Sequence, residues 1–370
     1  MLRYLKECVG SICIMKAIIL AAGRGQRLKC SLPKALLQIN GKTILQHQVT
    51  GLRDAGIKDI YVVCGYESDQ FPDIGANYVH NAEYARTDNS YSLLLALQQI
   101  GLDDYVVVLD GDVLFDYRIF NSIEEKSQYF VDTNKQRHRG DVGIKLAGAA
   151  IIEIGKHLNY GIGVGIMTFS PILLRALYHY LVRKEAHKTW WIVHLNQMMQ
   201  DKQNVEISPT FVNYDWVEVD TQEDYDEALK RFDNPKLEFT DYVHMKEVSS
   251  MYESLRFQFE GLHLNKRNPE RDEIAWKNSN VLAARLNGRV VGLCRYISDG
   301  AYYAGIWDVM VRPEYQRKQI GAKVLEATIS KIKLECPIKI FLFSTKGKEI
   351  FYQKFGFRFA KSPVLEIRND

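Results

Sequence analysis

The chain has 370 residues, 46% hydrophobic and 25% charged, with a formal net charge of +3. This composition is that of a folded protein with a large core, and it excludes intrinsic disorder, collagen-like repeats and disulfide-stapled miniproteins. At about 150 residues per domain, the length predicts two or three domains. The charge is uneven, because residues 1–235 contain 25 Lys and Arg against 29 Asp and Glu, whereas residues 236–370 contain 23 against 16. We expect a domain boundary there, with a second part that favours anionic ligands.

The cysteines and apolar segments bear on the compartment. The six cysteines form no Cys-x-x-Cys pair and no zinc-binding spacing, which is typical of a reducing cytoplasm. No apolar run approaches the roughly 20 residues of a membrane span, so we expect a cytoplasmic protein without membrane insertion. Residues 1–14 place Arg3 and Lys6 before an apolar stretch, but Lys16 interrupts that stretch. We treat residues 1–14 as an N-terminal extension of uncertain status.

Strand and helix patterns alternate in the first part of the chain. The continuous apolar run at residues 16–21 predicts a buried parallel strand. Further strands are expected at 59–64, 104–109, 160–169 and 217–219, and helices at 43–55, 90–100, 171–184, 192–201 and 221–232. Thr221 as N-cap with Asp224 three residues later predicts the start of the last helix. The alternation predicts an α/β domain over residues 15–235, built on a Rossmann-like doubly wound mixed sheet.

A turn at Asp233-Asn234-Pro235 ends this alternation. The second part, residues 236–370, has an α+β pattern. Helices are expected at 245–259, 321–334 and 347–355, and strands at 281–286, 289–298, 304–311 and 339–344, with a last short strand after Gly356. Asn287-Gly288 predicts a tight hairpin between the first two of these strands.

A glycine-containing loop, Leu20-Ala-Ala-Gly-Arg-Gly-Gln-Arg-Leu28, follows the first strand, with Pro33-Lys34 shortly after it. Glycines let the backbone approach phosphates, and exposed backbone amides bind anions. The third glycine of a dinucleotide site and the Walker pattern are both absent. The loop with Arg27 and Lys34 therefore predicts a triphosphate site.

This loop resembles the signature of the nucleotidyltransferases that make NDP-sugars and CDP-alcohols, over about residues 15–232. Three further segments match the same superfamily: Leu109-Asp110-Gly111-Asp112, Val217-Glu-Val-Asp-Thr221 and Asn89-Ser-Tyr-Ser-Leu93. The last segment, together with Cys64-Gly65-Tyr66, resembles the phosphocholine cytidylyltransferase branch. The resemblance implies CTP and Mg²⁺ as cofactors and a small phosphorylated or phosphonylated alcohol or amine as acceptor.

The resemblance also implies roles for individual residues. It makes Asp112 and Asp220 the metal ligands and assigns catalysis to Arg27 and Lys34. The nucleotide-binding residues that it implies are Leu20, Ala21, Ala22, Gly23, Arg24, Gly25, Asn89, Ser90 and Asp110. Two alternatives stay open: Asp110 either supports the site or ends the strand, and Asn89 and Ser90 either contact the base or cap a helix. The aromatic candidates for binding a choline-like acceptor are Tyr160, Trp190, Trp191, Tyr214 and Trp216.

The second part contains another phosphate-binding pattern. A strand ends near Val311, and the run Gln316-Arg-Lys-Gln-Ile-Gly-Ala322 opens a helix, whose N-terminal amides can bind a pyrophosphate. This run resembles the acetyl-CoA loop of the GNAT N-acetyltransferase superfamily, and Phe351-Tyr-Gln-Lys-Phe-Gly-Phe357 resembles its closing motif. The likeness covers about residues 237–360. The loop departs from the pattern at Gln319, where the superfamily usually carries glycine.

The GNAT resemblance implies acetyl-CoA as co-substrate. The acetyl-CoA-binding residues that it implies are Met310, Val311, Gln316, Arg317, Lys318, Gln319, Ile320, Gly321 and Ala322. It also implies a role for Tyr352, which matches the position that commonly protonates the leaving thiolate in this superfamily. Asp308 either acts as the base for the amine or only holds the strand.

These readings together predict a bifunctional enzyme that makes a CDP-activated headgroup and N-acetylates a small amine, for decoration of a cell-surface glycan or lipid. One alternative is a uridylyl- or thymidylyltransferase acting on a sugar 1-phosphate, with acetylation of an amino sugar. The other treats the second part as a regulatory module that binds acetyl-CoA without turnover, which Gln319 favours. We expect small-molecule partners and no nucleic acid, since no aromatic and basic recognition motif is present. A homo-oligomer is left open.

Overall fold

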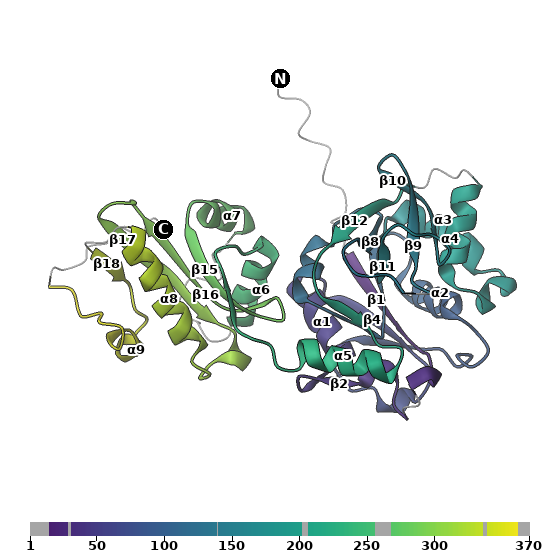
Figure 1. Cartoon of the computed structure of the whole chain (residues 1–370), viewed down its shortest axis with the longest axis horizontal. Helices are drawn as coiled ribbons and strands as arrows, with labels where there is room; N and C mark the ends of the chain where they lie inside the picture. Colours follow the sequence, from purple (N-terminus) through teal and green to yellow (C-terminus); the bar gives the residue numbers. More distant parts are fainter. Residues whose placement is uncertain are drawn as a thin grey trace, which may run out of the picture. The chain divides into compact units, whose positions relative to one another are not determined.

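The computed structural model describes residues 15–28, 31–138, 140–201, 206–255, 268–335 and 339–361, so the predicted extension at 1–14 lies outside the described residues. The chain divides into two compact units, with the division after Pro235. Each unit has its own sheet and core (Figure 1). None of the described helices is long and apolar enough to cross a membrane.

The first unit is built on a seven-stranded mixed sheet with the order β12-β8-β11-β6-β1-β4-β5. The strands are β1 (Met15–Ala21), β4 (Asp59–Cys64), β5 (Asn77–His80), β6 (Tyr105–Asp110), β8 (Gln128–Asp132), β11 (Ile162–Phe169) and β12 (Ser208–Val212). The central strand β1 pairs in parallel with β4 and β6, and β11 runs antiparallel to β6 and β8. The predicted α/β class with a mixed sheet is confirmed.

Helices cover both faces of this sheet (Figure 1). One face is covered by α2 (Asn89–Ile100), α3 (Pro171–Leu181) and α4 (Trp191–Gln200). The other face is packed by α1 (Ile44–Asp54), through Leu45, Val49 and Leu52. Both faces of β1 are buried for this reason, which explains its continuous apolar sequence.

Short strand pairs lie outside the seven-stranded sheet. Strand β13 (Trp216–Glu218) pairs antiparallel with β7 (Val113–Phe115), and β2 (Gln38–Ile39) pairs with β3 (Lys42–Thr43). Helix α5 (Gln222–Phe232) packs beside them and begins as predicted, with the Thr221 hydroxyl accepting a hydrogen bond from the Asp224 N–H. The two-stranded β9 (Gly143–Ala147) and β10 (Ala150–Gly155) ribbon was not predicted, because glycines and charges interrupt its alternation.

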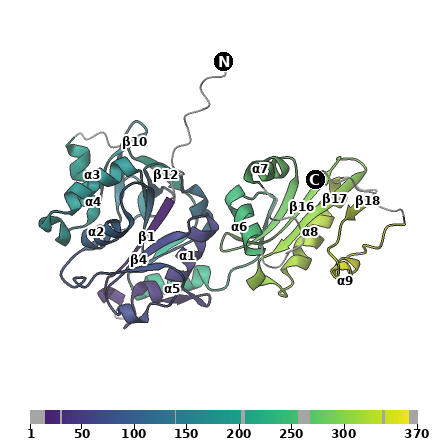
Figure 2. The same cartoon turned by 180° about the vertical axis from the view of Figure 1, so that it is seen from behind.

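The second unit has a five-stranded sheet with the order β14-β15-β16-β17-β18. Figure 2 shows three of these strands, β16, β17 and β18, together with helix α8. The strands are β14 (Glu238–Thr240), β15 (Asn280–Leu286), β16 (Arg289–Ser298), β17 (Tyr303–Val311) and β18 (Lys339–Leu342). Helix α8 (Ile320–Glu335) packs on one face, and α6 (Met245–Leu255) and α7 (Pro269–Lys277) pack on the other. This arrangement is α+β, as predicted.

The end of this unit differs from the prediction. The helix expected at 347–355 is the short α9 (Glu349–Gln353), because Gly347 lies in a turn with φ of +85° before it. Residues 357–361 form no strand, and the rest of the predicted last strand lies outside the described residues.

Candidate active sites

The loop of residues 22–25 follows the carboxyl end of β1, between the ends of β4 and β6. In an open α/β sheet, ligands bind at this edge. Two glycines allow other parts of the chain to pack closely around this loop. A Cβ on Gly111 would lie 2.6 Å from the Leu20 carbonyl oxygen, and Gly25 has φ of +61° with the Lys34 side chain folded over it.

Three carboxylates meet beside this loop. The Val219 N–H donates to the Asp112 carbonyl at 2.9 Å, which aligns the segment after β6 with the segment after β13. As a result, carboxylate oxygens of Asp112, Glu218 and Asp220 all lie within 4.8 Å of one another. The sequence prediction included Asp112 and Asp220 but missed Glu218, although Glu218 is two residues before Asp220 in the same matched segment.

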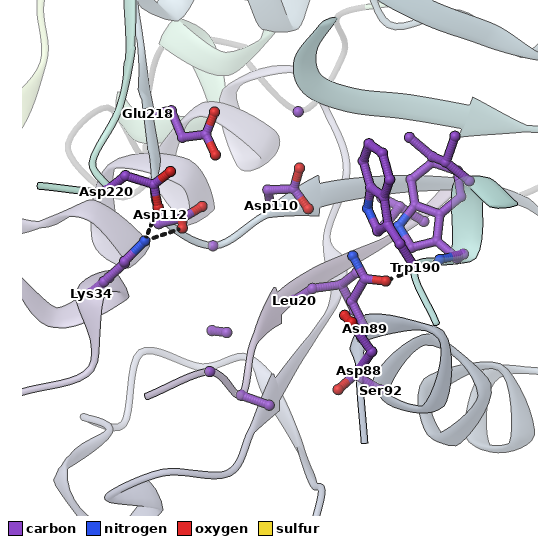
Figure 3. Close-up of a pocket in the computed structure, with 18 of the residues that line it drawn as sticks. Leu20, Lys34, Asp88, Asn89, Ser92, Asp110, Asp112, Trp190, Glu218 and Asp220 are labelled. Carbon is purple, nitrogen blue, oxygen red and sulfur yellow. Dashed lines mark hydrogen bonds and ion pairs between the residues drawn. The ribbon is translucent and has the colours of Figure 1, made fainter. Parts of the chain in front are cut away.

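Two cations neutralise these carboxylates. The Lys34 Nζ lies 2.9 Å from the Asp112 Oδ2 and forms a second ion pair with Asp220 (Figure 3). The Arg27 guanidinium donates to the Asp220 Oδ1 at 2.7 Å. Burial would lower the pKa of Lys34, but Asp112 and Asp220 outweigh burial and raise it, so the ammonium stays charged.

The carboxylate cluster fits a hard divalent cation. Mg²⁺ prefers oxygen ligands, and all three side chains supply them. Burial and the charges of Asp112 and Asp220 raise the pKa of Glu218 to about 7, which shows that negative charge is crowded here. The Lys34 ammonium already stands beside two of the carboxylates, which marks a position where positive charge is stabilised.

Asp110 occupies a separate place in the pocket. It ends β6 and points away from the three clustered carboxylates, between them and Trp190 in Figure 3. Burial raises the pKa of Asp110 well above its usual range, and Asp112 and Glu218 add to the rise. Gly165, with φ of +76°, leaves the room that the Asp110 carboxylate uses, because a Cβ there would lie 3.1 Å from its Oδ2.

These groups line one cavity of about 900 Å³. The predicted nucleotide-binding residues that line it are Leu20, Ala21, Ala22, Gly23, Arg24, Gly25, Asn89 and Asp110. Ser90 does not line it: this side chain is completely buried, so the structure contradicts a base contact there. Ser90 is the second residue of α2 and turns toward the core, whereas Asp88 and Asn89 face the cavity.

Asp88 and Asn89 are held by defined hydrogen bonds. Asp88 is the N-cap of α2, and its Oδ1 accepts from the Asn89 N–H at 2.7 Å. The Asn89 Oδ1 accepts from the Trp191 N–H at 3.1 Å, so its amide nitrogen is left as the donor. Asp88 was not predicted, although an Asp before a helical pattern is a recognised capping signal.

Of the five aromatic candidates, only Trp190 and Trp191 line the cavity. Trp216 is buried, with its Nε1 donating to the Asp132 carboxylate at 2.8 Å. Tyr214 packs under Arg118, and Tyr160 is half exposed against Phe211. Tertiary packing separates these three from the cavity. A further unpredicted residue, Lys156, also lines the cavity.

In the second unit, the predicted acetyl-CoA residues are contiguous. Met310 and Val311 end β17, Gln316–Gln319 form the loop, and Ile320, Gly321 and Ala322 begin α8. The Gln316 side chain donates to the Val311 carbonyl at 3.1 Å, which ties the loop to the strand. Arg317 and Gln319 have φ of +60° and +62°. The described pairing of β17 with β18 ends at Ile306 and Leu342, so β17 continues past its neighbour toward this loop.

Tyr352 and Asp308 have different surroundings. Tyr352 lies on α9, and burial raises the pKa of its hydroxyl to about 12. Its neighbour Phe351 reaches the start of α8, where a Cβ on Gly321 would lie 3.9 Å from the ring. The Asp308 carboxylate accepts from the Arg295 Nε at 2.5 Å, which favours the strand-holding alternative over a free base.

Comparisons with known proteins agree with these geometries. A family model described as the MobA-like NTP transferase domain matches residues 17–138, and an acetyltransferase (GNAT) domain model matches residues 277–359. The chain is 32% identical to the choline-phosphate cytidylyltransferase of Haemophilus influenzae over 232 residues, which cover 59% of this chain and 97% of that protein.

Two further comparisons concern Streptococcus pneumoniae. Its choline-phosphate cytidylyltransferase is 38% identical over 123 residues, which cover 31% of this chain and 52%, about half, of that protein. The solved structure of the CTP:phosphocholine cytidylyltransferase LicC matches with a TM-score of 0.52 and 23% identity, covering 59% of this chain and 98% of that one, and shows the same fold. The chain therefore belongs to the choline-phosphate cytidylyltransferase family of nucleotidyltransferases, and its second part carries a GNAT acetyltransferase domain.

Proposed function

We propose that residues 15–235 transfer CMP from CTP to a small phosphorylated or phosphonylated amine or alcohol, with release of pyrophosphate. We propose further that residues 236–370 transfer an acetyl group from acetyl-CoA to a small amine. The observation that carries the first proposal is the convergence of Lys34 with Asp112, Glu218 and Asp220 beside a glycine loop. The relatives are choline-phosphate cytidylyltransferases, which supports this acceptor class.

The transfer needs little proton chemistry. A phosphate monoester has a second pKa near 6 and is therefore mostly dianionic at pH 7, so its oxygen can attack the α-phosphorus without a general base. The site must align the reactants and offset negative charge. Arg27 and Lys34 would contact phosphate oxygens once they are released from Asp220. A Mg²⁺ ion held by the three carboxylates would supply further positive charge to the triphosphate.

The N-terminus of α2 supports cytosine over uracil. The Asn89 amide nitrogen presents a donor, while the Asn89 Oδ1 accepts from the Trp191 N–H. The neighbouring Asp88 carboxylate presents an acceptor. Cytosine places an amine at C4 beside an acceptor at N3, and this pattern matches the acceptor–donor pair. Uracil has the opposite pattern and would leave both groups unpaired, which discriminates strongly.

The other side of the cavity supports an acceptor that carries a cation. The Trp190 ring can stack on an ammonium group, and the Asp110 carboxylate lies between that ring and the clustered carboxylates (Figure 3). Phosphocholine, phosphoethanolamine and aminoethylphosphonate share a phosphorus oxyanion at one end and an ammonium at the other. CTP and acetyl-CoA as substrates would agree with the expected cytoplasmic location.

The first test measures pyrophosphate release in the presence of Mg²⁺. CTP, UTP, ATP and dTTP are each combined with phosphocholine, phosphoethanolamine, aminoethylphosphonate, glycerol phosphate and several sugar 1-phosphates. Turnover with CTP and an amine-bearing acceptor is expected. Turnover only with UTP or dTTP and a sugar 1-phosphate would refute the proposed nucleotide and acceptor. Asp112→Asn should abolish turnover, and the exposed Glu223→Gln serves as a matched control.

The second test measures CoA release from acetyl-CoA with a panel of amines, including the amine of the preferred acceptor. The arrangement of the Gln316–Gln319 loop at the start of α8, which the Phe351 ring of α9 approaches, supports this proposal. Binding of CoA without release by any amine would instead support a regulatory module.

A further inference from the structure

Three cationic side chains lie near the nucleotide loop, and they differ in their partners. Arg27 pairs with Asp220, and Lys34 pairs with Asp112 and Asp220. Arg24 also lines the cavity, but no ion pair to it occurs among the described residues. Its charge is therefore not offset by a carboxylate before a ligand arrives.

Two tyrosine rings hold the Arg24 side chain instead. The guanidinium carbon lies 5.8 Å from the centroid of the Tyr66 ring and 5.5 Å from that of the Tyr84 ring. Both distances are within the range of cation–π attraction. The two rings meet edge to face, with centroids 6.3 Å apart and an interplanar angle of 61°. A guanidinium stacks well on aromatic faces and keeps its N–H groups free for other acceptors.

The tyrosines are themselves fixed to the nucleotide loop. The Tyr66 N–H donates to the Ala22 carbonyl at 3.2 Å. Tyr84 packs on the bare face of Gly65, where a Cβ would lie 2.7 Å from the Tyr84 Cβ and 2.9 Å from the Ala22 oxygen. The end of β4 and the segment before α2 thus meet the loop at the position from which Arg24 projects.

We propose that Tyr66 and Tyr84 are positioning residues that orient Arg24 to bind the polyphosphate chain of the nucleotide. The inference rests on the proposed nucleotidyltransferase reaction but not on the identity of the base or of the acceptor. An arginine fork can bind two phosphate oxygens at once, and fixing its side chain beforehand reduces the conformational freedom lost on binding. Without the tyrosines, Arg24 would keep its charge but lose its orientation.

The test measures binding of inorganic tripolyphosphate with Mg²⁺ to the full chain by calorimetry. Arg24→Ala should weaken this binding about tenfold, which corresponds to about 1.4 kcal/mol. The double variant Tyr66→Leu/Tyr84→Leu should weaken it by a similar factor, and adding Arg24→Ala to that variant should cause little further loss. The phenylalanine pair, Tyr66→Phe/Tyr84→Phe, should restore binding, because the rings and not the hydroxyls hold the guanidinium.

Steady-state kinetics supply a second readout. The leucine pair should raise KM for the nucleotide about tenfold and change kcat at saturating nucleotide by less than twofold. The exposed Arg86→Ala, on the same segment as Tyr84, is the matched control and should change neither value.

Three results would overturn the inference: unchanged tripolyphosphate binding in the leucine pair, additive losses in the triple variant, or failure of the phenylalanine pair to restore binding. These results are distinct from a failure of the proposed function. If the wild-type chain binds tripolyphosphate but does not use CTP, the base assignment fails while the role of the tyrosines can still be measured.

Discussion

Gln319 provides a sharp test of the loop that precedes α8. Its φ of +62° lies in the left-handed region, where a side chain costs about 1–2 kcal/mol and glycine has no such penalty. Glycine also makes the unfolded chain more flexible, which lowers the free energy of unfolding by about 0.4–1 kcal/mol. Subtracting the second effect from the relief of strain predicts that Gln319→Gly stabilises the second unit by about 0.8 kcal/mol.

Lys318→Gly is the matched control. Lys318 stands between two left-handed residues, but it does not itself have a positive φ. Glycine there gains no relief from strain and loses the contact of the Lys318 ammonium with the Tyr315 ring, at 5.4 Å. We expect a loss of about 0.5–1 kcal/mol, so the two neighbouring substitutions should have opposite signs.

Scanning calorimetry of the full chain measures both changes. The transition of the second unit is identified as the one that added CoA shifts upward, since a ligand that binds the folded state stabilises it. A change of 0.8 kcal/mol should raise the midpoint of this transition by about 3 °C in a unit of this size. If Gln319→Gly lowers the midpoint as much as Lys318→Gly does, Gln319 does not have a strained left-handed conformation in the folded protein.

Three further predictions concern other sites. Glu218→Gln should weaken Mn²⁺ binding, measured by electron paramagnetic resonance, about tenfold or more, because it replaces one of the three carboxylates of the proposed cation site with a neutral amide. Tyr352→Phe should lower kcat for acetyl transfer about 100-fold with unchanged CoA affinity, because the role proposed for the hydroxyl is to protonate the leaving thiolate. The raised pKa of Tyr352, about 12, keeps the hydroxyl protonated below that pH, so the wild-type rate should show no loss from tyrosine ionisation up to pH 10. Arg285→Ala should destabilise the second unit by about 3–5 kcal/mol, because it leaves the buried Glu247 carboxylate unpaired.

Each of these has an outcome that contradicts it. Unchanged Mn²⁺ affinity in Glu218→Gln would remove Glu218 from the cation site. A Tyr352→Phe enzyme with normal kcat would assign Tyr352 to packing. The loss of stability caused by Arg285→Ala should appear in the transition that CoA shifts. An equal loss of stability in the other transition would contradict a role of Arg285 confined to the second unit.

Local sequence determined much of the secondary structure. The apolar run at 16–21 can only be buried on both faces, and it forms the central strand β1. Thr221 and Asp224 satisfy each other's backbone groups at the start of α5, as their spacing predicts. These features depend on neighbours within a few residues. Elements with weak local patterns, such as β9 and β10, were missed because their stability comes from pairing with one another.

The matched motifs also indicated most of the candidate site. They predicted that Lys34, Asp112 and Asp220 act together, although Asp112 and Asp220 lie 78 and 186 positions after Lys34 in the sequence. The motifs did not distinguish Ser90, which is buried, from Asn89, which faces the cavity. The two residues are neighbours in one helix, and consecutive helical residues point their side chains toward different faces.

Only the tertiary structure decided which side chains share a cavity. Glu218 joins Asp112 because β13 pairs with β7, and Trp216 is separated from the cavity because its indole binds Asp132. The pairing of Arg24 with Tyr66 and Tyr84 likewise depends on where β4 ends relative to β1. Sequence specifies local backbone preferences, which act over a few residues. Distances between side chains far apart in the chain depend on strand order and packing, which no short segment contains.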